Sequence, residues 1–161
     1  MNSGDRIALL GINGSGKSSI LKLLTGENIS FSGTLEMGSN LQISYISQDT
    51  SFLQGRLKNF ARSTCIDESL FKAILRKLGF ERVQFEKDMS AFSDGQKKKV
   101  LLARSLCEQA HLYIWDEPLN FIDVLSRIQI EELILRCRPT LLFVEHDSTF
   151  VSSIATKKVN L

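Results

Sequence analysis

The sequence predicts an α/β fold with a mostly parallel sheet, flanking helices and a small helical insertion. Three apolar runs, at residues 7–10, 112–115 and 140–144, lack the alternation of a half-exposed strand, which is typical of strands buried on both faces of a parallel sheet. Helical patterns lie between these runs. Strand signals are absent from about residue 50 to residue 92, and we expect a helical subdomain over about 50–105, within one domain spanning 1–161.

Composition favours a single cytoplasmic domain. The chain has 161 residues, 43% of them apolar, which is enough for one sizeable core, and its net charge of +2 does not by itself imply a polyanionic partner. Three widely spaced cysteines, Cys65, Cys107 and Cys137, argue against a disulfide framework or a zinc site and are expected to be mostly buried thiols. The apolar runs are too short for a membrane segment, and no signal peptide is predicted.

The first strand leads directly into a complete GxxxxGK[ST] pattern at residues 11–18, and residues 19–24 then predict a helix. Glycines let successive N–H groups turn toward a phosphate, and a helix N-terminus adds the positive end of its dipole. Lys17 can reach the outer phosphates of a nucleotide and the Ser18 hydroxyl can ligate Mg²⁺. The alternative is a ligand-free glycine turn, which the flanking elements and two later motifs disfavour. The residues assigned to nucleotide binding are Gly11, Asn13, Gly14, Ser15, Gly16, Lys17, Ser18 and Ser19.

Short strands are expected next, at residues 34–37 and 43–46, followed by a helix over 68–78 that Gly79 ends. Residues 50–99 hold eleven Lys and Arg against six Asp and Glu, a net charge of +5. Phenylalanines beside basic residues could stack on bases, but in so small a helical unit they more often form its core. Six of the ten phenylalanines are in this segment: Phe52, Phe60, Phe71, Phe80, Phe85 and Phe92.

The strand at 112–115 ends in two adjacent carboxylates, Asp116 and Glu117. Asp116 is placed to hold Mg²⁺ opposite Ser18, and Glu117 to act as general base on a water molecule. A strand that ends in an Asp-Glu-Pro turn without a catalytic role is common, but the phosphate-binding pattern upstream disfavours that interpretation here. His111 is expected on the surface and Trp115 in the core.

Residues 92–96, Phe-Ser-Asp-Gly-Gln, open a helical run over 97–106. This stretch resembles the LSGGQ signature of ABC ATPases, in which a serine hydroxyl and a glycine N–H face a γ-phosphate. Lys97, Lys98 and Lys99, expected in the first helical turn, oppose the helix dipole and suggest an external anion. Taken alone, the pattern fits a helix cap with a solvated lysine patch better.

Other segments resemble further ABC motifs in the right order: Gln48 the Q-loop, residues 119–123 the D-loop and His146 the switch histidine. The resemblance implies that Gln48 contacts the γ-phosphate and Mg²⁺, that Glu117 activates water and that His146 stabilises the transition state. It also implies that Ser93, Gly95 and Gln96 act on the nucleotide of a second ABC domain, so ATP hydrolysis to ADP and phosphate requires a dimeric sandwich.

The sequences at 115–123, 145–150 and 154–161 are similar to those of the second domains in the ABC-F branch. That resemblance implies a partner ABC domain in the same chain, the ribosome and its RNA as partner, no membrane domain, and protection of ribosomes against antibiotics. The antiparallel strands that open such domains are missing before Gly4, so we expect an N-terminally truncated fragment. Phe92 and Asp94 also depart from the signature. The alternatives are the ATPase subunit of a membrane transporter, or a non-hydrolysing interaction module, against which the intact catalytic residues argue.

Overall fold

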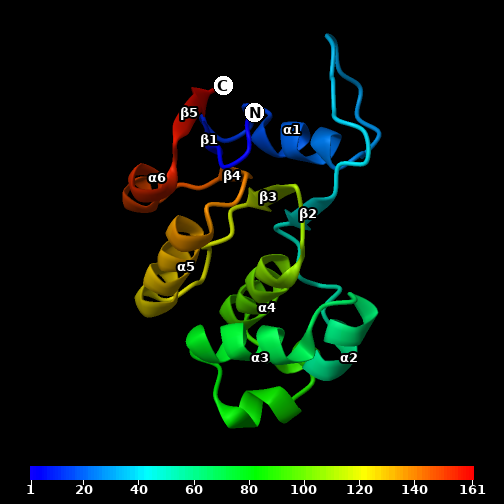
Figure 1. Ribbon diagram of the computed structural model, residues 1–161, viewed down its shortest axis with the longest axis vertical. Coiled ribbons are helices and arrows are strands. Elements are labelled where there is room, and N and C mark those ends of the chain that lie inside the picture. Colours follow the sequence, from blue (N-terminus) through cyan, green and yellow to red (C-terminus); the bar gives the residue numbers. More distant parts are fainter.

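The computed structural model describes residues 1–161 and has one sheet of five parallel strands in the order β2-β3-β4-β1-β5 (Figure 1). The strands predicted around residues 7–10, 43–46, 112–115 and 140–144 are all present, and the α/β prediction is confirmed. The strands are β1 (Arg6–Leu10), β2 (Ile43–Ile46), β3 (Leu112–Asp116), β4 (Leu141–Val144) and β5 (Lys157–Asn160).

Helices cover both faces of this sheet. Residues that alternate along β4 separate the two cores: Leu142 and Val144 pack with Leu21 of α1, whereas Leu141 and Phe143 join the large core under the other helices. The helices are α1 (Lys17–Leu24), α2 (Leu57–Ser63), α3 (Glu68–Lys77), α4 (Asp94–Cys107), α5 (Val124–Cys137) and α6 (Ser148–Ile154), with short 3-10 helices η1 (Arg82–Glu86) and η2 (Met89–Ala91). None of these helices has the length and hydropathy that crossing a bilayer requires.

The strand predicted at residues 34–37 is absent. These four residues are exposed and make no backbone hydrogen bond, and Figure 1 shows the segment projecting from the body of the molecule. A strand needs a neighbouring strand to complete its backbone hydrogen bonds. No strand lies beside residues 34–37, so their apolar pattern alone does not make them a strand.

The insertion is helical, with α2, α3, η1 and η2 between β2 and α4. The predicted stop of α3 is confirmed: Gly79 has a left-handed φ of 82°, and the N–H groups of Gly79 and Phe80 donate to the carbonyls of Arg76 and Leu75 at 3.0 and 2.9 Å. Most of the phenylalanines form its core, as expected. Phe71, Phe80 and Phe92 are buried, Phe60 and Phe85 pack against them, and Phe52 is exposed.

The expectation of mostly buried thiols is wrong, because Cys65 and Cys137 are exposed and Cys107 is only partly buried; all three are free. Cys65 lies in the turn after α2 with a φ of 55°, and Cys137 is the last residue of α5. Trp115 is fully buried, as predicted, and its indole N–H donates to Ser105 Oγ at 2.9 Å.

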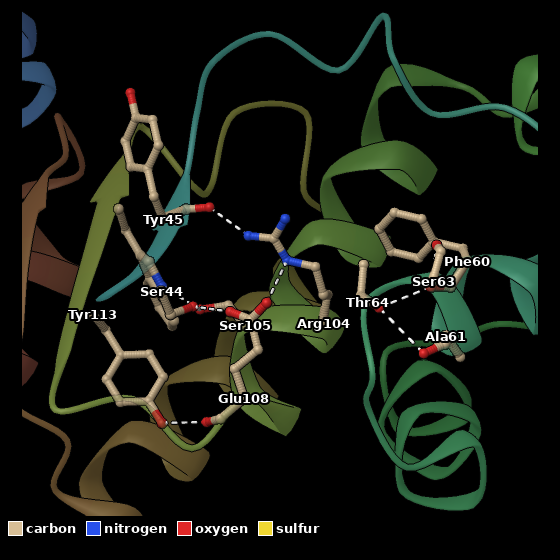
Figure 2. A network of polar contacts seen from close by, with 11 residues as sticks. Ser44, Tyr45, Phe60, Ala61, Ser63, Thr64, Arg104, Ser105, Glu108 and Tyr113 are labelled. Carbon is tan, nitrogen blue, oxygen red and sulfur yellow. Dashed lines mark hydrogen bonds and ion pairs between the residues drawn. The ribbon is translucent and has the colours of Figure 1, made fainter. Parts of the chain in front are cut away.

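Polar contacts join edge strand β2 to α4 (Figure 2). Ser44 Oγ lies 2.7 Å from Ser105 Oγ and also donates to Glu108, while the Arg104 guanidinium donates to the Tyr45 carbonyl at 2.5 Å. Ser105 and Arg104 belong to α4 and Glu108 is its C-cap, so the network fixes the helix against the sheet. Because a helix is stiff, these contacts also set where the N-terminus of α4 lies.

Candidate functional site

The candidate site lies where the parallel strands end. β1 is followed by the glycine-rich loop, β3 by Glu117 and β4 by His146, while Gln48 comes two residues after β2. The register pairs Asp116 with Val144, which brings the carboxyl ends of β3 and β4 level. Ligands of open α/β sheets bind at this edge, so the topology gathers the predicted catalytic residues where the fold class expects them.

The glycine-rich loop depends on backbone shapes that other residues rarely adopt. Gly14 and Gly16 have φ values of 82° and 94°, and Gly16 is the N-cap of α1. A Cβ atom at Gly11 would lie 2.7 Å from Ser15 Oγ and 3.0 Å from the Leu161 carbonyl oxygen, so only glycine fits there. The first turn of α1 has no side-chain cap and no acidic residue, which leaves its N–H groups open to an anion.

Lys17 is only 7% exposed, and its ammonium folds back onto the loop, donating to the carbonyls of Gly11 and Ile12 at 2.8 Å each. An ammonium has three N–H donors, so one remains for a ligand. The Ser15 hydroxyl is buried without a partner in the protein. The Lys17 side chain borders a pocket of ≈ 250 Å³ that is lined by Asn13, Gly14, Gly16, Lys17, Ser18, Ser19 and Glu117. The loop can therefore receive phosphate, with a carboxylate on the facing wall.

Asp116 suits a Mg²⁺ ligand. It is 2% exposed and forms no ion pair, and its Oδ1 accepts a hydrogen bond from Gln48 Nε2 at 3.1 Å. A buried carboxylate without a paired cation, joined to an amide side chain, offers the oxygen ligands that Mg²⁺ prefers. Ser18, in the first turn of α1, would complete the protein's share of the ligands.

Glu117 has the surroundings of a general base. Its Oε1 lies 3.3 Å from His146 Nε2, and its Oε2 accepts from Asn120 Nδ2 at 2.7 Å. The residue has a φ of 49°, a left-handed conformation that costs a side-chain-bearing residue about 1 kcal/mol or more. That backbone turn separates the Glu117 side chain from Asp116 and directs it to the pocket beside the phosphate loop.

Glu145, which no sequence motif singles out, organises the same edge. It is 5% exposed, and its two oxygens accept from the backbone N–H of His146 at 2.8 Å and of Leu119 at 3.1 Å. Because this buried carboxylate binds the backbone of both loops, it fixes the position of His146 relative to the segment after Glu117. Its place directly after a buried apolar strand was the available signal.

The signature segment forms the start of α4. Ser93 is the N-cap: its Oγ accepts from the Gln96 N–H at 3.3 Å, and Gln96 Oε1 accepts from the Ser93 N–H at 3.0 Å. The helix therefore begins at Asp94, and Lys98 and Lys99 lie beyond its first turn, contrary to the sequence expectation. The N–H groups of Asp94 and Gly95 have no partner within the helix.

Two of the three lysines, Lys98 and Lys99, also act differently from the expectation of an external anion. Lys98 is 4% exposed and donates to the Ser47 carbonyl at 3.0 Å, and Lys99 pairs with Asp123 at 2.5 Å. Burial lowers the pKa of Lys98, and the charges of Asp116, Glu117 and Glu145 oppose that effect. Both lysines thus join α4 to the loops of this domain's own site.

Gly95 lies against the loop after β3. A Cβ atom at this position would be 2.4 Å from the Phe121 carbonyl oxygen, so a side chain has no room. Phe121 itself has a φ of 65° and is 74% exposed. The glycine of the signature is therefore required by packing, in addition to any contact with a nucleotide.

The structure brings together some predicted site residues and not others. Lys17, Ser18 and Glu117 share the phosphate-loop pocket, Gln48 contacts Asp116, and His146 contacts Glu117. Gln48, Asp116 and His146 lie outside the lining of that pocket, and so do the signature residues Ser93, Gly95 and Gln96. The individual roles of these residues stay predictions.

Comparison with known proteins gives the family. The profile of the ABC transporter family matches residues 1–120. The chain is 31% identical to ATP-binding protein Uup of Caulobacter vibrioides over 98% of this chain, and 30% identical to ribosome protection protein VmlR of Bacillus subtilis over 97%. It spans only 28% and 29% of the lengths of these two relatives.

Among solved structures, archaeal ribosome recycling factor aABCE1, in complex with ribosomal stalk protein aP1, superposes with a TM-score of 0.81 at 24% identity. That match covers 99% of this chain and 32% of the other, and at this identity it supports the fold alone. The family match covers most of the chain and includes the phosphate loop, the signature helix and Asp116 with Glu117. The chain belongs to the ABC transporter family and is an ATP-binding domain of the ABC type.

Proposed function

We propose that this domain binds Mg-ATP and hydrolyses it to ADP and phosphate when paired with a second ABC domain. The observation that carries the proposal is Glu117 on the wall of the phosphate-loop pocket, 3.3 Å from His146. In this scheme Lys17 and the loop amides bind phosphate, and Ser18, Gln48 and Asp116 would hold Mg²⁺, which would offset phosphate charge when bound. Glu117 takes a proton from the attacking water, and His146 donates to developing charge on phosphate.

We propose further that the domain is part of a longer ABC-F protein that acts in the cytoplasm on the ribosome and protects it from antibiotics. Two observations support this: the motif sequences at 115–123 and 145–150, and the similarity to VmlR. The signature residues Ser93, Gly95 and Gln96 would then contact the nucleotide held by the second domain. The division into one domain, with a helical subdomain at about 50–105, belongs to the same proposal.

Replacing Lys17 with Met should weaken Mg-ATP binding by about tenfold or more, because a charge-assisted hydrogen bond to phosphate is lost while the aliphatic stem remains. Isothermal titration calorimetry on the native protein measures this. Lys22→Met on the same helix is the control, since Lys22 is exposed and outside the pocket. Equal loss in both variants would contradict a phosphate role for Lys17.

Association with the ribosome can be tested with a variant in which hydrolysis is blocked. The Glu117→Gln form of the native protein should co-sediment with ribosomal particles in ATP and be released when ADP replaces it, because only the ATP-closed pair presents the binding surface. Sucrose-cushion centrifugation with both nucleotides measures this. Protein that stays in the supernatant with ATP at low salt would exclude the ribosome as partner.

The other candidate is the ATPase subunit of a membrane transporter, which the family's name and shared site residues favour. That function requires a membrane partner. Affinity purification of the native Glu117→Gln protein with ATP separates the two: recovery of ribosomal particles supports the first proposal, and recovery of an integral membrane protein supports the second.

A further inference from the structure

A second pocket lies on the helical subdomain, far from the phosphate loop. It has a volume of ≈ 480 Å³ and is formed by the last two turns of α3 together with η1, at the end of the molecule opposite α1 (Figure 1). None of its residues belongs to the site described above. The lining residues are Lys72, Arg76, Phe80, Arg82, Phe85 and Glu86, and we call this the α3–η1 pocket.

Two arginines in this pocket have no acceptor in the protein. Neither the Arg76 nor the Arg82 guanidinium forms an ion pair or donates a hydrogen bond, whereas Lys72 is neutralised by Glu68 at 2.6 Å. Each guanidinium has five N–H donors in a planar fork that matches the oxygens of a phosphate. The pocket therefore offers unused hydrogen-bond donors of the type that recognises phosphate.

Aromatic packing holds one of these arginines in place. The Arg76 guanidinium carbon lies 5.6 Å from the centroid of the Phe85 ring, and Phe85 packs edge-on against buried Phe80 with centroids 6.0 Å apart. Arg82 opens η1, whose start is fixed by a capping box between Glu81 and Gln84. A cation held beside an aromatic ring loses less conformational freedom on binding than one on a free surface.

The charge around the pocket favours an extended polyanion. Residues 68–87, from the start of α3 to the C-cap of η1, carry five basic residues against three acidic ones, so an anionic chain gains from the surrounding field as well as from the pocket. Glu86 is the one carboxylate in the lining, and it would repel an acidic side chain or a phosphate placed directly against it, so the occupant must place a hydrogen-bond donor there. An RNA strand can instead offer the Glu86 carboxylate a donor, because each ribose has a 2′-hydroxyl.

We propose that the α3–η1 pocket binds the phosphate and ribose groups of an RNA backbone, with Arg76 and Arg82 contacting phosphate. The RNA would be ribosomal if the proposed function holds, so its source rests on that proposal. The chemistry of the pocket is independent of ATP hydrolysis, since no lining residue is shared with the ATP site.

The test is the double variant Arg76→Ala/Arg82→Ala in the native protein, measured by fluorescence anisotropy with a labelled single-stranded RNA at several salt concentrations. We expect binding about tenfold weaker or more, since two charge-assisted hydrogen-bonding groups are removed. The slope of log affinity against log salt should fall by about 1.4, because each single-strand phosphate that is no longer neutralised accounts for about 0.7. Arg76→Lys/Arg82→Lys should keep the salt slope and lose part of the affinity, because lysine retains charge without the fork.

Arg136→Ala/Lys158→Ala is the matched control, because it removes two exposed cations from α5 and β5 and should leave both readouts unchanged. RNA binding by the Arg76→Ala/Arg82→Ala variant equal to that of the wild type would overturn the pocket proposal. The proposal would also fail if this variant lost binding to poly-glutamate but kept binding to RNA, since the pocket would then fit an acidic protein surface.

Ribosome co-sedimentation separates this inference from the proposed function. If the wild type binds RNA through the pocket but does not sediment with ribosomes, the pocket proposal stands and the ribosome proposal fails. If the wild type sediments with ribosomes and the Arg76→Ala/Arg82→Ala variant does so equally at every salt concentration, the pocket proposal fails and the ribosome proposal stands.

Discussion

Glu117→Gln in the native protein should slow ATP hydrolysis by about 10²–10⁴-fold and leave ATP binding intact. The substitution keeps the size of the side chain. Its amide oxygen can still accept from Asn120, and its amide nitrogen can face His146, so both contacts of the carboxylate are replaced. Only the basicity that takes a proton from water is lost.

Single-turnover phosphate release measures this effect, because it isolates the chemical step from product release. Glu132→Gln is the control: this exposed glutamate on α5 lies outside the site, so its variant should turn over like the wild type. A Glu117→Gln protein with an unchanged single-turnover rate would rule out Glu117 as the general base.

Gly95→Ala should destabilise the domain by about 1–3 kcal/mol, which is the usual cost of overpacking. The added Cβ would lie 2.4 Å from the Phe121 carbonyl oxygen, and that atom is backbone, so it cannot swing aside as a flexible side chain can. Either α4 or the loop after β3 must shift. A lower midpoint of urea unfolding, with an unchanged slope, would report the loss.

Gly38→Ala provides the comparison, because a Cβ there meets no atom within 4 Å and the position has no positive φ. Its unfolding midpoint should match that of the wild type. A Gly95→Ala variant as stable as Gly38→Ala would mean that α4 and the Phe121 loop are free to separate, and that packing does not require the glycine of the signature.

Local chemistry was enough to predict the sheet and the phosphate loop. Residues 7–10, 112–115 and 140–144 are apolar without alternation, and such runs become central parallel strands in most contexts. The left-handed positions Gly14 and Gly16 were equally predictable, since their conformation is a property of glycine itself. Residues 34–37 show the limit of this reasoning, because a strand also depends on what lies beside it.

The roles of charged side chains could not be predicted in this way. Lys98 and Lys99 are adjacent in a basic run that is typical of a solvent-exposed surface, yet Lys98 is buried against Ser47 and Lys99 pairs with Asp123, partners 51 and 24 positions away. The position of Glu145 directly after a buried strand was a signal for the residue itself, but its contact with the backbone N–H of Leu119 was not predictable. These contacts join segments far apart in the chain, and sequence spacing carries no signal for them.

The two edges of the sheet are protected against pairing with another chain by different means. At the β2 edge, the side chains of Arg104 and Lys98 donate hydrogen bonds to the carbonyls of Tyr45 and Ser47. These acceptors are then not available to a strand of another chain.

On β5 every residue is exposed, and two of its four residues are adjacent lysines. Lys157 pairs with Asp5 at 2.9 Å, so Lys158 carries the unpaired charge. Adding a strand there would desolvate that charge, and charge on an edge strand is a recognised protection against aggregation. Salt screens the charge on β5 and so weakens this protection. The protection of β2 consists of hydrogen bonds and is not weakened in this way. At high ionic strength the β5 edge is therefore less protected than the β2 edge against pairing with a strand of another molecule.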